Sequence, residues 1–389
     1  MKRRKNLMNA LRQAWVRAML FIVLPSSAYG MTQHQPTNTA LHSRTSWIVS
    51  PSFKFDVLCF INVLTGDPFY LRYYGDEYSA FASRLSPRAR AALAVLKRRL
   101  RDDNKVIISA FLSLYFSATE DQSLDDMLRT IDRSELMKSN LRQTVYFNKG
   151  GWKLYESVRV ELRTIFVSLK EIGFADYWRQ NILPKVQQKI ASLGNKLIDY
   201  DVVSEVENCL GFALPSNTIT VYMLYFAQPH GIRLTGLRFI ADISYPFTVV
   251  LQNALHEMMH PPFDLARDRE LREALNSLKA DSFLMDTIKN HNPSFGYNSF
   301  DGFIEEDCVR ALDQVASERL KIGRDARQRW KDEDDGMHVF SVALYSLMKQ
   351  ESFSQSQEPF REFLIRMIRT GKLAKGKIKT IYQDFIAKR

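Results

Sequence analysis

The stretch LHEMMHPPFD, residues 255–264, most constrains the fold because two prolines directly follow a pair of histidines. His256 and His260 are four positions apart, so on a helix their imidazoles lie on one face, one turn from each other. Pro261 has no amide hydrogen, and it disfavours helical geometry at the residue before it. We therefore predict a helix that ends at His260, after which the chain turns away at once.

The same stretch has the spacing H-E-x-x-H, which suits a catalytic zinc ion. His256 and His260 can reach one tetrahedral Zn²⁺, and Glu257 leans toward the vacant side of the metal. There it can act as the general base for a zinc-bound water. The upstream residues VVLQNAL are uncharged, as a buried metal-binding helix requires. The alternative is an ordinary helix end that contains two hydrogen-bonded histidines.

A third ligand has to come from elsewhere, because positions 263 and 266 are Phe and Ala, where a third-histidine motif has Gly and His. The segment GFIEEDCVRAL, residues 302–312, is predicted to be helical and offers two glutamates. We choose Glu306 as the third ligand, and Glu305 stays open as an alternative. Apolar neighbours argue against a wholly exposed acidic helix face. The other open candidates are Asp264, Glu270, Glu273, His291 and His338.

Three further side chains are candidates for supporting roles around such a site. Arg310 follows Glu306 by one helical turn and is expected to pair with a carboxylate outside the ligand set. Tyr297 and His338 are candidate oxyanion donors, with a purely structural role as the alternative for each.

The N-terminus has the order of an export signal. Residues 1–30 contain six basic and no acidic residues, then the apolar run 18–24, then small residues. We predict a signal peptide cleaved after Ala28 or Gly30, and a secreted or periplasmic bacterial protein; an uncleaved basic helix is the alternative. No apolar run reaches the roughly 20 residues of a membrane span. Cleavage lowers the net charge from +11 to +5, which argues against a nucleic-acid partner.

The rest of the chain divides into segments that differ in their sequence pattern. Residues 31–50 lack periodicity and are predicted to be a flexible leader. Residues 51–214 are predicted to be mainly helical, with one helix opened by Ser86-Pro87 as its cap and first-turn proline.

Residues 215–389 contain the motif and a change of pattern. Two β-rich stretches, 218–226 and 232–243, predict an antiparallel strand pair, with Gly236 as a bulge. Pro246 is placed to open the helix that carries the two histidines, and further helices follow. We predict an α+β fold that is mostly helical, with a small antiparallel sheet beside the motif helix.

The three cysteines, Cys59, Cys209 and Cys308, are far apart and contain no C-x-x-C pair. A structural zinc knuckle is therefore not expected. In an exported protein they allow one disulfide, and the three pairings stay open.

These residues resemble zincin metallopeptidases, in particular the gluzincin arrangement of two histidines and a distant glutamate. More narrowly, H-E-x-x-H-P followed about 45 residues later by E-x-x-V-R-A is similar to uncharacterised families of exported bacterial metallopeptidases. The resemblance covers roughly residues 215–315. It implies that His256 and His260 bind zinc together with a third ligand, Glu306, and that Glu257 is the general base.

The resemblance also implies a function, an exported zinc metalloendopeptidase that acts on peptides or proteins. A strand before the metal helix would hold the substrate in extended form, a role for residues 232–243. Two alternatives stay open: a non-catalytic zincin-like envelope or binding protein, and a helical surface protein without metal. The oligomeric state is not predicted.

Overall fold

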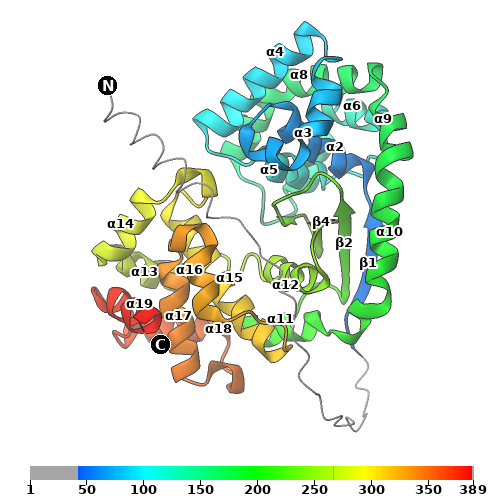
Figure 1. Ribbon diagram of the computed structural model, residues 1–389. Coiled ribbons are helices and arrows are strands. Elements are labelled where there is room, and N and C mark those ends of the chain that lie inside the picture. The colour runs from blue at the N-terminus through cyan, green and yellow to red at the C-terminus, as the bar shows by residue number, and fades with distance from the viewer. Residues whose placement is uncertain (1–42, 266, 388–389) are drawn as a thin grey trace, which may run out of the picture.

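The computed structural model describes residues 43–265 and 267–387, which form a mainly helical α+β fold (Figure 1). This confirms the predicted class. Before residue 215 the helices are α2 Phe53–Leu64, α3 Pro68–Ala82, α4 Pro87–Lys97, α5 Ile108–Phe116, α6 Leu124–Asp132, α7 Glu135–Leu141, α8 Lys149–Glu171, α9 Phe174–Tyr177, α10 Leu183–Leu193 and α11 Val202–Leu210. After the sheet they are α12 Phe247–Met258, α13 Arg269–Ser277, α14 Ser282–Asn290, α15 Phe300–Arg319, α16 Ala326–Asp332, α17 Val339–Gln350, α18 Phe360–Arg369 and α19 Lys377–Ala387.

The sheet is mixed rather than antiparallel. Its strands, in the order β1-β2-β4-β3, are β1 Ser46–Pro51, β2 Thr218–Leu224, β4 Arg238–Asp242 and β3 Ile232–Arg233. Strands β1, β2 and β4 are parallel, and only β3 runs antiparallel to β4.

The predicted antiparallel pairing of residues 218–226 with 232–243 is therefore wrong. The second stretch is not one strand, because the chain reverses between β3 and β4 at Gly236, whose φ is +72°. Glycine adopts this left-handed conformation without the penalty that other residues incur. The reversal makes β4 run in the same direction as β2, and Gly236 belongs to a turn rather than to a bulge.

Residues 46–50, predicted to belong to a flexible leader, instead form most of β1. They pair in register with β2, from Ser46 opposite Thr218 to Pro51 opposite Met223. The sheet thus joins the segment before the N-terminal helices to the region after residue 215. The predicted signal peptide, and the leader up to residue 42, lie outside the described residues.

The helix carrying the first histidine lies at the centre of the molecule. Helix α10 packs on β1 and β2, whereas α12 packs on β4, α11 and α15. Figure 1 shows α12 with the strands on one side and the C-terminal helices on the other. Its buried residues are Val250, Leu251, Ala254, Leu255, Glu257 and Met258. This burial holds the helix end in a fixed position between the sheet and α15.

The structure also bears on the cysteines, on membrane-spanning helices and on two predicted helix starts. Cys59, Cys209 and Cys308 are buried and unpaired, so the disulfide that they allowed does not form. Within residues 43–265 and 267–387, no helix has the length and apolarity needed to cross a membrane. The predicted cap of α4 is confirmed, because the Ser86 side chain accepts a hydrogen bond from the Ala89 amide. Helix α12 begins directly after Pro246, the residue predicted to open it.

Candidate metal centre

Helix α12 ends earlier than predicted, at Met258 rather than at His260. Pro261 explains this, because it disfavours helical backbone at His260 and cannot donate a hydrogen bond. A last tight turn nevertheless keeps the second histidine close: the His260 amide donates to the Glu257 carbonyl at 3.4 Å. The two histidines therefore stay neighbours although only His256 is helical.

Helix α15 supplies the carboxylates. It begins after Ser299, whose side chain accepts from the Gly302 amide, and it is buried along most of its length. Both Glu306 and Asp313 are almost fully buried on it. They are seven residues apart, which is two helical turns on one face. Because α15 packs against α12, this face meets the two histidines.

The three predicted ligands lie together. The Nε2 atoms of His256 and His260 are 3.1 Å apart. A Glu306 oxygen lies 3.6 Å from the first of these atoms, and the other oxygen lies 3.4 Å from the second. One donor atom from each residue falls within 4.8 Å of the others. Metal–ligand bonds of about 2.0–2.1 Å give a tetrahedron whose edges are about 3.3 Å. The group could therefore hold a metal ion.

Glu305, the alternative third ligand, is placed differently. Its Oε1 atom lies 3.3 Å from Nδ1 of His260, on the opposite side of the ring from the Nε2 atom that faces His256. The Glu305 side chain is 36% exposed, whereas that of Glu306 is 4% exposed. Glu305 is thus placed to orient His260 rather than to complete the group.

Asp313 has a role that the sequence reasoning missed. Its Oδ2 atom lies 2.8 Å from Nδ1 of His256, and Arg329 holds the same carboxylate. With Nδ1 bound to a carboxylate, the Nε2 lone pair of His256 is directed at the group. The two-turn spacing from Glu306 was the available signal, because it places both carboxylates on one helix face.

Arg310 pairs with carboxylates outside the ligand set, as expected, and it also contacts the predicted ligand Glu306 directly. Its Nε donates to Glu306 Oε1 at 2.7 Å, and its other nitrogens contact Glu333 and Asp334. Burial alone would raise the pKa of Glu306, but Arg310 and the two histidines hold that pKa well below its usual range. Glu306 is therefore a carboxylate with one oxygen bound to arginine and the other facing His260.

Carboxylates surround the second histidine of the site. Burial alone would lower the pKa of His260, but Glu305 and Glu306 outweigh it and raise the pKa to about 10. Glu257 adds to the same effect. Without another cation, the carboxylates thus hold a proton on His260, and a metal ion would take over that positive charge.

Glu257 lies on the sheet side of the site and is 7% exposed. Its Oε1 atom is 3.2 Å from the position that a Cβ on Gly231 would take. Gly231 directly precedes β3, so the carboxylate is next to the start of the edge strand. The lack of a side chain at Gly231 provides this close approach.

The remaining candidates for a third ligand are engaged elsewhere. Both ring nitrogens of His291 bind backbone carbonyls, and Glu270 binds Arg361 and Arg369. Glu273 pairs with Arg269, and Asp264 pairs with Arg267. None of these side chains belongs to the metal-binding group.

The two candidate oxyanion donors differ. His338 is buried and its two nitrogens contact Asp307 and Asp334, which favours the structural alternative for this residue. Tyr297 lies beside Glu306 and Arg310. Burial and the Glu306 charge raise the pKa of its phenol, which therefore stays protonated as a donor.

The N-terminal helical region, residues 51–214, also reaches the site. The Tyr146 hydroxyl donates to the His260 carbonyl at 3.3 Å and accepts from Arg233 Nε at 2.9 Å. Arg233 belongs to β3 and also contacts the sulfur of Met258. These contacts tie the non-helical turn at His260 to the edge strand.

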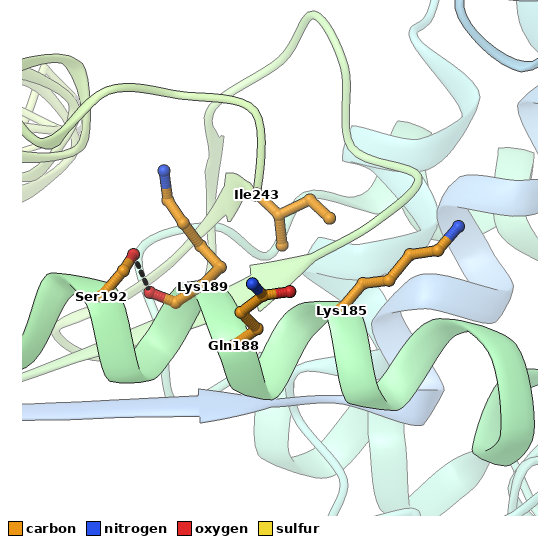
Figure 2. A pocket seen from close by; sticks show the side chains of 5 residues that line it. All are labelled: Lys185, Gln188, Lys189, Ser192 and Ile243. Atoms are coloured by element: carbon orange, nitrogen blue, oxygen red, sulfur yellow. Dashed lines mark hydrogen bonds between the residues drawn. The ribbon is translucent and has the colours of Figure 1, made fainter.

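A separate hollow of about 310 Å³ lies where α10 faces the end of β4 (Figure 2). Its lining shares no residue with the metal-binding group. The lining residues are Lys185, Gln188, Lys189, Ser192 and Ile243.

Comparisons with protein-family models, curated proteins and solved structures find no match.

Proposed function

We propose that this protein is an exported, zinc-dependent peptidase whose centre is formed by His256, His260 and Glu306. One observation carries the proposal: two imidazole nitrogens and a carboxylate converge within 4.8 Å, and Glu257 belongs to the same helix end. Two histidines and one glutamate are a donor set of catalytic zinc sites, in which a fourth position stays open. Calcium and magnesium prefer oxygen ligands, so the two imidazoles favour zinc.

Zinc, when bound, would supply a Lewis acid that polarises a peptide carbonyl and makes water easier to deprotonate. The residues of the chain would do the rest. Glu257 takes a proton from the attacking water and passes it to the leaving amine nitrogen as the peptide C–N bond breaks. Asp313 holds His256 in one tautomer and orientation, and Glu305 does the same for His260. Tyr297 is a protonated donor beside the site.

The position of strand β3 in the sheet argues for a peptide substrate. It is the last strand of the sheet, so an extended peptide can add to it through main-chain hydrogen bonds. Its first residue, Ile232, follows Gly231, which lies against the Glu257 carboxylate. A peptide on this edge would therefore pass close to the general base.

The experiment combines metal analysis with cleavage of an unbiased peptide library. We expect one zinc per chain in the wild type and in Glu257→Gln, with cleavage lost only in the variant. Glu273→Gln is the matched control, because Glu273 is an exposed glutamate that pairs with Arg269 on α13. Stoichiometric zinc with equal cleavage by the wild type and Glu257→Gln would contradict the peptidase mechanism. Zinc without cleavage by any form would favour the alternative, a zincin-like binding protein.

A further inference from the structure

The outer contacts of the metal-binding group converge on one residue. Arg310, which holds Glu306, donates to Glu333 Oε2 at 2.7 Å. Arg329, which holds Asp313, contacts the same Glu333 oxygen at 3.1 Å. Glu333 therefore lies between the two arginines that orient the carboxylates of α15.

The contacts form a closed circuit around the site. One branch runs from Glu333 through Arg310 to the ligand Glu306. The other runs through Arg329 and Asp313 to His256, whose Nδ1 atom contacts Asp313 at 2.8 Å. Two ligands on different helices are thus held by one carboxylate that touches neither of them. Arg324 adds a third cation to Glu333.

The backbone that carries Glu333 is strained. Asp334 and Asp335 have φ of +46° and +54°, in the left-handed region. Residues other than glycine hold this conformation only where surrounding contacts stabilise it. Here the Asp334 carboxylate contacts Arg310 at 3.1 Å and His338 at 2.9 Å. The strained turn thus presents the carboxylates of Glu333 and Asp334 to Arg310, which in turn holds the ligand Glu306.

We propose that Glu333 is a positioning residue for the metal, which sets the geometry of Glu306 and of His256 through the two arginines. This inference rests on the proposed zinc binding and adds to it a residue outside the ligand set. Carboxylates that orient metal ligands from outside typically account for about 10- to 100-fold in metal affinity. Glu333 acts on two ligands at once, so its loss should disturb both.

The test is zinc affinity, measured by competition with a chelating indicator, together with the thermal unfolding midpoint of the metal-free protein. Glu333→Gln keeps the size of the side chain and removes its charge. We expect zinc binding to weaken at least about 10-fold, because the arginines lose the anion that they share. Glu333→Asp keeps the charge but has a shorter side chain. Its zinc affinity should fall between that of Glu333→Gln and that of the wild type.

Glu351→Gln is the matched control. Glu351 is likewise held by more than one cation, Arg366 and Lys372, and its side chain is 24% exposed against 20% for Glu333. Its loss should lower thermal stability and leave the zinc affinity unchanged.

The outcomes separate the two proposals. A wild type that does not bind zinc would overturn the proposed function itself. A wild type that binds zinc, with an equal dissociation constant in Glu333→Gln, would overturn the positioning role alone, as would a shift in unfolding midpoint without a shift in affinity. If Glu333→Gln does not fold, Glu333→Asp decides, and an unchanged dissociation constant in that variant overturns the role.

Discussion

The Asp313 carboxylate lies 2.8 Å from Nδ1 of His256, although the two residues are 57 positions apart in the chain. This contact orients the first histidine of the motif from the helix that also carries Glu306. The same helix therefore provides one candidate ligand directly and positions another through a hydrogen bond.

Replacement of Asp313 by Asn tests this relationship. The amide keeps the shape and loses the charge, so zinc affinity should fall by about 10-fold. An indicator competition titration measures it. Asp301→Asn is the control, because Asp301 lies exposed in the first turn of the same helix, and its loss should leave the affinity unchanged. Equal affinities in the two variants would contradict the role of Asp313.

Glu305 and Glu306 form a natural pair of variants. Glu306→Gln removes a donor from the group, so we expect zinc affinity to fall by about 100-fold or more, whereas Glu305→Gln should cost about 10-fold or less. Isothermal titration with zinc under identical buffer conditions distinguishes them. A larger loss in Glu305→Gln would show that the third ligand is the more exposed glutamate.

His230 should make the protein sensitive to acid. Burial, aided by Arg101, lowers the pKa of His230 to about 4, and its Nε2 lies 3.0 Å from the Tyr70 hydroxyl. The unfolded chain, with a histidine pKa of about 6.5, binds more protons between these values, so stability is lost as pH falls through this window. This contribution amounts to about 2.5 kcal/mol between pH 7.5 and pH 4.5.

Urea unfolding of the wild type and of His230→Phe at both pH values measures the difference. Phenylalanine keeps a ring next to Phe69 and does not titrate. The variant should be less stable at pH 7.5, because Tyr70 loses its partner, but should lose less stability on acidification. An equal loss in both proteins would contradict the prediction.

Gly211 and Gly173 both have positive φ, of +81° and +71°, but differ in surroundings. A Cβ at Gly211 would lie 2.5 Å from Cβ of Pro359, whereas nothing lies within 4 Å of the corresponding position at Gly173. Gly173→Ala should cost about 1 kcal/mol of unfolding free energy from backbone strain alone. Gly211→Ala should cost about 2–4 kcal/mol, because overlap with Pro359 adds to that strain. Chemical denaturation of the two variants compares them, and equal costs would show that Pro359 gives way freely.

Two predictions about the sheet failed, one because the paired strands are far apart in the chain and the other because of a local reversal. Strand β1 ends a polar segment and pairs with β2 more than 160 positions later. No local pattern marks such a partner, so the residues read as a leader. The direction of β4 depended on the reversal at Gly236, which is one residue in an otherwise alternating stretch.

The local features of the protein follow from its amino-acid sequence alone. The α+β class follows from the periodicities, and the neighbourhood of His256 and His260 follows from their spacing and from the covalent geometry of Pro261. The packing of distant segments selects the carboxylates that face the histidines. It also leaves Glu305 outside the group and places Asp313, Arg310 and Glu333 around it. The physical reason is that these contacts depend on how α12 packs against α15 and on the turn at Glu333, whereas spacing along the chain fixes only neighbours within a few turns.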